Sequence, residues 1–398
     1  MKNEMRELPD LAGRVDEISS FHVMELVKRA KQLEEEGRSI IHLNIGEPDF
    51  TAPQRVVEAL KTAVDGGQTS YTGALGLYAL RERIADHYKD AYRVEVDPRR
   101  VVVTAGASGA LVLAFAALLE SGREVLLSDP GYPCNRNFVS ALGGIPKCIP
   151  VDAASRFQLN ADLLRDWWSD RVAGVLLASP ANPTGTAVGA AELERIVSFV
   201  REKKRFLVVD EIYAGLMYDE EPRTALAYGD DFVVTNSFSK FFHMTGWRLG
   251  WLVVPPEWVA AFEKIAQSLY ICPSTLAQHA ALACFDDESL EVFRLRRDEF
   301  KRRRDYLVPE LRRLGLDVPV LPDGAFYLYI DCSQWSDDSD RFASEMLEQA
   351  GVSVVPGLDF GRYEPERYLR LSYANSMENL REAVARIEVW LSHRMRVR

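Results

Sequence analysis

Short apolar runs alternate with longer amphipathic stretches through the middle of this 398-residue chain. The short runs are rich in valine and leucine, as the strands of a buried parallel sheet are, and the stretches between them have the length of helices. This alternation predicts an α/β fold with a mostly parallel, doubly wound central sheet covered by helices. The expected strands are residues 101–104, 124–128, 174–178, 206–209, 232–235 and 251–254.

The pattern of apolar and charged residues changes outside this central region. Before residue 101 and after about residue 285, long charged helical patterns such as 288–314 dominate, with short apolar runs at 324–330 and 368–372. We therefore predict a second, smaller α/β domain built from both chain ends. The expected division is residues 1–48 as an N-terminal arm and part of the small domain, 49–285 as the large domain, and 286–398 as the small C-terminal domain.

Charge and hydropathy narrow the range of partners. A net charge of −11 disfavours nucleic acid, because proteins that bind a phosphate backbone carry a basic patch. The longest apolar run, residues 110–119, is too short to cross a bilayer and predicts a buried helix. The first ten residues are charged rather than apolar, unlike a secretory signal. We expect neither a nucleic-acid partner nor a membrane partner.

The cysteines lie far apart in the sequence and in no CxxC spacing. An odd number in this arrangement predicts neither a disulfide framework nor a zinc site. We therefore expect reduced thiols, a cytoplasmic location and no metal. The five residues are Cys134, Cys148, Cys272, Cys284 and Cys332.

Lys240 is the most informative single residue, because its ammonium lies in an apolar, aromatic run that ends in Phe241 and Phe242. Burial lowers the pKa of a lysine, and a neutral amine can attack a carbonyl. The ordinary alternative is a surface lysine whose stem lies along apolar neighbours. Two hydroxyls before Lys240 and Arg248 after it favour a site for an anionic ligand that carries an aldehyde.

Chemically distinctive residues follow four of the expected strands. In open α/β sheets, ligands bind beyond the carboxyl ends of the strands. The segment 106–108 follows the first strand, Asn182 the third, Asp210 the fourth and the segment 237–240 the fifth. None of these is specific by itself, but their shared position predicts one site at this edge of the sheet.

Seven ordered strings between Ile45 and Ala374 carry a family resemblance. The chain resembles the class I/II aminotransferases of the fold type I pyridoxal phosphate (PLP) enzymes, which implies that fold for the large domain. The strings are residues 46–50 (GEPDF), 71–76 (YTGALG) followed by Leu80 and Arg81, 181–185 (ANPTG), 210–213 (DEIY), 237–240 with 246–250, 324–327 (GAFY) and 370–374 (RLSYA).

The resemblance implies roles for four residues around the cofactor ring. Lys240 would hold PLP as an internal aldimine and later move the α-proton of the substrate. Asp210 would keep the pyridine nitrogen protonated, and Tyr213 and Asn182 would bind the phenolic oxygen. By themselves, Asp210 also fits a helix N-cap or a metal-binding aspartate, although no GxxxxGK[ST] loop accompanies it, and the ANPTG string also fits a turn.

The cofactor phosphate needs amide donors at a helix start and cationic or hydroxyl partners. Gly106, Ala107 and Ser108 open the apolar helix expected at 110–119, where the helix dipole favours an anion. A lone glycine-rich turn of this kind is more often a simple helix cap. By resemblance, Ser237, Ser239 and Arg248 supply the other contacts, with Arg248 as a bidentate clamp.

Two tyrosines have implied roles at the rim of the site. Tyr132 would stack on the free face of the cofactor, although simple core packing accounts for it as well. Tyr71 matches a tyrosine that in the family reaches the phosphate of the neighbouring subunit. The resemblance therefore implies a homodimer with composite active sites.

The substrate contacts are also implied by the resemblance. Arg370 would grip the α-carboxylate through a two-pronged salt bridge, with Gly46 and Asn182 beside it. A surface arginine with a solvated head would not account for the surrounding RLSYA string. The expected reaction moves an amino group between an α-amino acid and a 2-oxo acid by a ping-pong mechanism through internal aldimine, external aldimine and quinonoid.

The position of a second cation distinguishes the dicarboxylate-specific relatives. Gln267 and Ser108 occupy the two places where those relatives carry an arginine or a lysine. The donor is therefore expected to be neutral, such as alanine or an aromatic or aliphatic amino acid, with aspartate possible. Phe21, Tyr132 and Phe326 could line its pocket, and each fits a place in the core equally well.

Three other functions compete with this interpretation. Residues 237–240 also fit the SxxK string of a serine hydrolase, but the SDN and KTG strings that should accompany it do not occur. A transcription regulator would need a basic DNA-binding domain, and only about forty mostly acidic or helical residues precede Gly46. A PLP-dependent carbon–sulfur β-lyase or related synthase would use the same cofactor residues and remains open.

Overall fold

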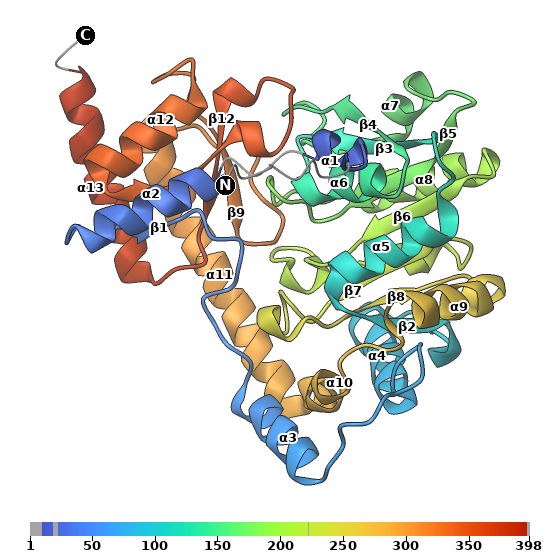
Figure 1. The fold of residues 1–398 in the computed structure, drawn as a ribbon. Helices are drawn as coiled ribbons and strands as arrows, with labels where there is room; N and C mark the ends of the chain where they lie inside the picture. Colours follow the sequence, from blue (N-terminus) through green and yellow to red (C-terminus); the bar gives the residue numbers. More distant parts are fainter. Residues whose placement is uncertain (1–9, 19–22, 222, 396–398) are drawn as a thin grey trace, which may run out of the picture.

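The computed structural model describes residues 10–18, 23–221 and 223–395. Within them, a seven-stranded sheet forms the centre of the molecule, with the strand order β2-β8-β7-β6-β5-β3-β4 (Figure 1). Only β8 runs antiparallel to its neighbours in this sheet, so the predicted mostly parallel α/β fold is confirmed. The strands are β2 (Val101–Thr104), β3 (Glu124–Asp129), β4 (Ile145–Pro150), β5 (Val172–Ala178), β6 (Phe206–Asp210), β7 (Val233–Ser237) and β8 (Gly250–Val253).

Alternating side chains of these strands enter two separate cores. In β6, Leu207 and Val209 join the core on one face of the sheet, whereas Phe206 and Val208 join the other. Successive strand residues point to opposite faces, and both faces are covered here, so the strand reads as a continuous apolar run. This is why six of the seven strands could be predicted from apolar runs alone.

The missed strand is β4, at the edge of the sheet. Its sequence, IPKCIP, contains Pro146, Pro150 and Lys147, and most of its residues are only partly buried. Proline cannot donate to a strand ladder, but an edge strand tolerates it because one side is unpaired. The sequence of β4 is therefore typical of a loop, although the segment pairs with β3 in parallel.

Helices cover both faces of the sheet. The apolar run at 110–119 forms α5, which packs against β7, β8 and α9, so the predicted buried helix is confirmed. These elements are α3 (Gln54–Asp65), α4 (Tyr78–Tyr92), α5 (Gly106–Leu118), α6 (Pro133–Ala141), α7 (Ala161–Asp166), α8 (Ala190–Glu202), α9 (Val259–Tyr270) and α10 (Thr275–Leu282). No described helix is both long and apolar enough to cross a membrane.

The two chain ends meet beside a second, antiparallel sheet of the order β11-β12-β9. Here β1 pairs with β10, so Ile41 lies opposite Val352 and segments from the two ends of the sequence are joined. The elements are α1 (Arg14–Glu17), α2 (Val23–Glu35), β1 (Ile41–His42), α11 (Asp287–Arg313), β9 (Tyr327–Asp331), α12 (Ser339–Glu345), β10 (Val352–Ser353), β11 (Val355–Pro356), β12 (Tyr368–Ser372) and α13 (Met377–Met395).

The long helix α11 links this small sheet to the rest of the molecule. Figure 1 shows it running from the region of β9 to the region of α10 and α3. The contribution of both chain ends agrees with the sequence prediction, whereas the boundaries at residues 48 and 285 stay predictions. The arrangement places β9 and β12 opposite the carboxyl ends of β5, β6 and β7.

Candidate active site

A cavity of about 590 Å³ lies between the carboxyl ends of the central strands and the small sheet. It collects residues from segments far apart in the sequence, as an α/β fold predicts for its ligand site. The expected site residues that line it are Gly46, Ala107, Ser108, Tyr132, Asn182, Asp210, Tyr213, Ser239, Lys240, Arg248 and Arg370.

Lys240 lies in the turn that follows β7, and its amine points into this cavity. Its Nζ donates to the carbonyl oxygen of Gly46 at 2.6 Å and lies 5.9 Å from the centre of the Tyr213 ring. Burial lowers the pKa of Lys240 to about 8, and the nearby carboxylate of Glu47 partly opposes this effect. A sizeable neutral fraction near neutral pH makes the amine a competent nucleophile.

Asp210 is the last residue of β6 and is 6% exposed. Its Oδ1 accepts a hydrogen bond from the backbone N–H of Ile212 at 3.2 Å. Burial raises the pKa of this carboxyl group to about 7, against the opposing effects of that hydrogen bond and of Lys240. A basic ring nitrogen placed against Asp210 would give the carboxylate a cation and favour its ionised form.

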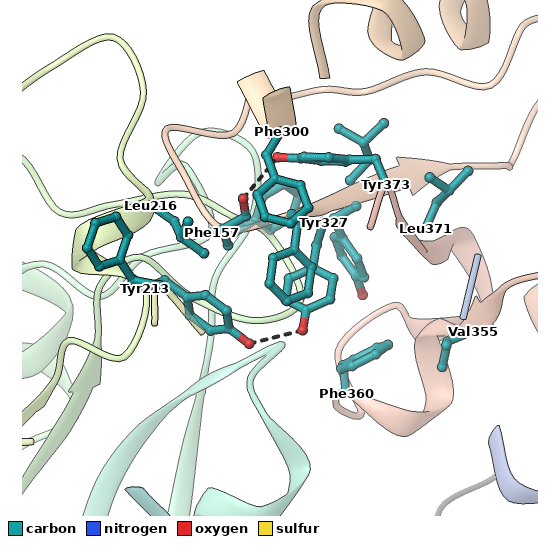
Figure 2. Packing of buried hydrophobic residues seen from close by; sticks show 14 of the residues in the cluster. Phe157, Tyr213, Leu216, Phe300, Tyr327, Val355, Phe360, Leu371 and Tyr373 are labelled. Atoms are coloured by element: carbon teal, nitrogen blue, oxygen red, sulfur yellow. Dashed lines mark hydrogen bonds between the residues drawn. The ribbon is translucent and has the colours of Figure 1, made fainter. Parts of the chain in front are cut away.

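Tyr213 and Asn182 lie on the same side of the cavity. The hydroxyl oxygens of Tyr213 and Tyr327 are 3.0 Å apart, and Figure 2 shows the two groups pointing toward each other. Burial raises the pKa of Tyr213 well above its usual range, so the phenol keeps its proton. Asn182, in the loop after β5, accepts a hydrogen bond from Arg370 Nη1 through its Oδ1 at 3.1 Å.

The start of α5 and Arg248 form the anion-binding end of the cavity. Gly106 has φ +74°, a conformation that favours glycine, and a Cβ there would lie 2.7 Å from Arg248 Nη2. Arg248 Nη1 donates to the carbonyl of Thr245 at 2.8 Å. Ala107 and Ser108 line the cavity where the first amides of α5 are unpaired, an arrangement suited to a phosphate.

The resemblance implies that Ser237 contacts the bound phosphate directly, whereas the structure places it outside the cavity lining. It is fully buried and lies behind the lining residues. Its hydroxyl lies 3.1 Å from the Leu249 carbonyl and accepts from the Ser239 N–H at 3.0 Å. Ser237 therefore holds the turn that presents Ser239 and Lys240, and Gly106 similarly supports the lining without being part of it.

Arg370 enters the cavity from β12 and is only 7% exposed. Its Nη2 donates to the carbonyl of Asn44 at 2.8 Å, and its guanidinium lies 4.7 Å from the centre of the Tyr327 ring. Its buried Nε has no hydrogen-bond partner among the described residues. An arginine held in this way, with a donor unused, is suited to bind a carboxylate through two hydrogen bonds.

Several expected residues lie outside the cavity of the described chain. Tyr71 is 79% exposed in the loop before α4, and Gln267 is exposed on α9. Phe326 is fully buried between Phe300 and Tyr213 and is not part of the lining, so of its two expected places, the pocket and the core, the structure shows the core. Phe21 lies outside the described residues.

Four lining residues lie in strings that had been noticed but were not predicted at the site: Ile212, Gly246 and the polar residues Tyr327 and Glu47. Tyr327 ends the GAFY string and begins β9, and Glu47 follows Gly46 in the GEPDF string. Glu47 is exposed at the rim, where its Oε2 accepts from Thr245 Oγ1 at 3.1 Å. A polar residue inside each string was the available signal, but only the fold shows that both line the cavity.

Comparisons with known proteins agree with this site. Residues 38–387 match the family model for class I and II aminotransferases. A valine–pyruvate aminotransferase of Mycobacterium tuberculosis is 38% identical over 376 residues, 94% of this chain and 97% of that protein. An aspartate aminotransferase of Pyrococcus abyssi is 34% identical over 384 residues, 95% of this chain and 97% of that protein. A crystal structure of an aminotransferase from M. tuberculosis has a TM-score of 0.93 at 37% identity and covers 97% of this chain and 100% of its own.

The chain belongs to the class I and II aminotransferases. It is a transaminase of fold type I, and its cofactor is pyridoxal 5'-phosphate. The cavity fits this group: it offers an amine for the aldehyde, a buried carboxyl group for the ring nitrogen, and a helix start with an arginine for the phosphate.

Proposed function

We propose that the enzyme transfers the amino group of a neutral α-amino acid to a 2-oxo acid by a ping-pong mechanism. The proposal rests on the cationic side chains that line the cavity. Among the described residues these are Lys240, Arg248 and Arg370. The first would react with the aldehyde, the second would bind the phosphate, and the third would bind the α-carboxylate. No cation is left in this lining for a second carboxylate on the substrate.

The residues of the cavity divide the chemistry between them. When bound, the cofactor supplies the aldehyde and an electron sink for the α-carbon. Arg370 fixes the α-carboxylate, which brings the α-C–H toward the side of Lys240. Lys240 Nζ would take the α-proton and return it to the carbon that carried the cofactor's aldehyde, and its pKa of about 8 suits both transfers. Asp210 keeps the ring nitrogen charged, and Tyr213 and Asn182 stabilise the phenolic oxygen.

A carbon–sulfur β-lyase would use the same cofactor contacts, but it would release ammonia and pyruvate. The names of the two relatives favour transamination, and they span a neutral donor, valine, and an acidic donor, aspartate. The choice of donor therefore depends on the lining of this chain. Ser108 stands in that lining without a charge, and Gln267 lies outside it on the exposed face of α9.

The donor preference can be tested with a panel of amino acids and either 2-oxoglutarate or pyruvate. We expect aspartate to have no advantage in kcat/KM over alanine, valine, leucine or phenylalanine, because its distal carboxylate would lack a partner. Formation of the new amino acid and of ammonia should be followed together. A kcat/KM for aspartate roughly a hundred-fold above that of every neutral donor would contradict the proposal. Release of ammonia and pyruvate from a donor with a sulfur leaving group on its β-carbon, such as cystathionine, would indicate the lyase.

A matched pair of variants makes the test sharper. Ser108→Lys should selectively improve aspartate, and Ser108→Ala should not, since only the first adds a cation to the lining. Gln267→Arg should improve aspartate only if α9 of a partner subunit faces the cavity, because Gln267 does not reach the cavity of its own chain.

We also propose a homodimer in which each site uses Tyr71 of the other subunit. In support, Tyr71 is 79% exposed, and Leu269 at 54% and Ile271 at 49% are exposed at the end of α9. The hydroxyl of Thr275 donates to the carbonyl of Ser70 at 2.8 Å, which ties the segment before Tyr71 to the start of α10. Exposed apolar surfaces of this kind mark protein interfaces.

Hybrid dimers test the composite site. Coexpression of a Tyr71→Ala chain with a Lys240→Ala chain should give hybrids with one intact and one doubly defective site, and these should regain activity that neither parent has. Affinity tags of two kinds allow the hybrids to be purified. A hybrid as inactive as the Lys240→Ala parent, or a fully active monomer in sedimentation, would show that Tyr71 does not act across an interface.

A cytoplasmic location is proposed from the cysteines. All five lie in described parts of the chain and are free thiols, and burial raises the pKa of Cys284 well above its usual range. Unpaired thiols are typical of proteins in a reducing compartment.

A further inference from the structure

Tyr327 lies at the centre of the contacts between the catalytic groups. It is fully buried at the start of β9 and lines the cavity. Its hydroxyl lies 3.0 Å from that of Tyr213 and donates to the carbonyl of Gly46 at 3.2 Å. Its ring lies against the guanidinium of Arg370, at 4.7 Å from the ring centre.

The single proton on each phenol fixes the direction of these hydrogen bonds. Burial raises the pKa of both Tyr213 and Tyr327, so both hydroxyls are protonated. A carbonyl can only accept, so the proton of Tyr327 points to Gly46. Tyr213 must therefore be the donor to Tyr327, and its own proton is occupied by this bond.

The same carbonyl also connects this pair to the reactive amine. Gly46 O accepts from Lys240 Nζ at 2.6 Å as well as from Tyr327. A chain of hydrogen bonds therefore runs from Lys240 through Gly46 and Tyr327 to Tyr213. When the Tyr213 hydroxyl turns to a bound cofactor oxygen, it has to give up the bond to Tyr327, because one proton cannot serve both acceptors fully.

We propose that Tyr327 is a positioning residue with two functions: its hydroxyl competes with the cofactor for the Tyr213 proton, and its ring face holds Arg370 in place for the substrate carboxylate. This inference rests on the proposed transaminase function of the site. The hydroxyl and the ring of Tyr327 carry the two functions separately. One substitution can therefore remove the hydroxyl alone, and another can remove the ring as well.

Substitutions of Tyr327 leave the other charged and titratable groups around Tyr213 and Tyr327 unchanged. Arg370 faces both phenols from β12, and Tyr132 faces Tyr213 from the start of α6. Glu47 faces Tyr327 and Lys240 from the segment after β1, and Asp210 and Arg248 face Lys240. If removal of the Tyr327 hydroxyl changes the pH midpoint of the cofactor's absorption band, the change can therefore be assigned to the Tyr213–Tyr327 hydrogen bond. This requires that the same substitution is also measured in a Tyr213→Phe background.

Tyr327→Phe tests the function of the hydroxyl. The readout is the pH midpoint of the visible absorption band that the Lys240–cofactor link gives in the loaded protein. Freed from Tyr327, the Tyr213 hydroxyl should bind the phenolic oxygen more strongly and stabilise its anionic form, which lowers the midpoint by about half to one pH unit. In a Tyr213→Phe background, the same substitution should produce no shift. An unchanged or raised midpoint in the single variant would overturn the proposal.

Tyr327→Leu tests the function of the ring. The loss of the face against Arg370 should weaken binding of a monocarboxylate such as 3-phenylpropionate about 3- to 30-fold, measured by equilibrium titration, whereas Tyr327→Phe should keep the wild-type affinity. Equal affinities in the Leu and Phe variants would overturn this half of the proposal. If wild-type protein gave no visible band with pyridoxal phosphate, the transaminase function itself would fail, which is a separate outcome.

Discussion

Lys240→Ala is expected to lower turnover by roughly 10⁴-fold or more, because the variant loses both the nucleophile and the group that moves the α-proton. Alanine removes only the amine and its stem from the turn after β7, where the backbone is held by other contacts such as those of Ser237. The protein should therefore still fold and bind the cofactor without a covalent link. Single-turnover transfer from an amino acid to the cofactor is the direct measurement.

Lys28→Ala is a suitable control, since this lysine is exposed on α2, away from the cavity. It should retain wild-type turnover and the absorption band. If Lys240→Ala retained more than a few per cent of the wild-type rate, another amine would have to carry the proton, and the central role given to Lys240 would be wrong.

Arg370→Ala should have the second largest effect, and it should act through the substrate carboxylate. Removing one partner of a buried charge pair costs about 2–5 kcal/mol, which corresponds to about 30- to 5,000-fold in kcat/KM. The loss should be similar for every amino donor, because all of them share the α-carboxylate. A donor panel with the purified variant, alongside a check that it binds pyridoxal phosphate normally, provides the measurement.

Two further variants separate charge from geometry at this position. Arg370→Lys keeps the charge but loses the planar fork, so it should recover only a small part of the loss. Arg367→Ala removes a neighbouring arginine whose ion pairs with Asp331 and Glu364 lie at the surface, and it should leave kcat/KM near wild type. An Arg370→Ala enzyme that loses activity toward only one donor would show that Arg370 binds a side chain rather than the shared carboxylate.

The large sheet could be predicted from sequence because its central strands are buried on both faces. Short runs of valine and leucine between amphipathic stretches are typical of such strands, and the apolar helix α5 is equally clear. The edge strand β4 escaped detection because its prolines and lysine are tolerated only at an edge. The two-residue strands β1 and β10 are too short to leave a pattern, and their pairing depends on the packing of both chain ends.

The candidate site was predictable to the extent that its residues follow strands. Asp210 comes directly after an apolar run, and Asn182 and Lys240 follow within about five residues of one, so the general rule for α/β sheets brings them together. The contact between Arg370 and Asn44 joins residues 326 positions apart, and no local pattern specifies it. For Arg370 and Gly46, the family resemblance supplied the expectation and the fold supplied the geometry.

The errors also have physical causes. Phe326 is the last turn residue before β9 and Tyr327 is the first residue of the strand, and of the two only Tyr327 lines the cavity. Ser237 is the buried last residue of β7, whereas Ser239 lies in the turn that follows and lines the cavity, a difference that the sequence alone does not show. Sequence identifies the segment in such cases, whereas the backbone decides which of its side chains meets the ligand.

The most direct test of the account is the chemical position of the cofactor. The loaded protein is reduced with borohydride, which fixes the covalent link, and its peptides are analysed by mass spectrometry. We expect one pyridoxyl group per chain on Lys240, and none after prior treatment with an amino acid donor that converts the cofactor to its free amine form. A pyridoxyl group on any other lysine, or no fixed group in protein that shows full transaminase activity, would contradict the account.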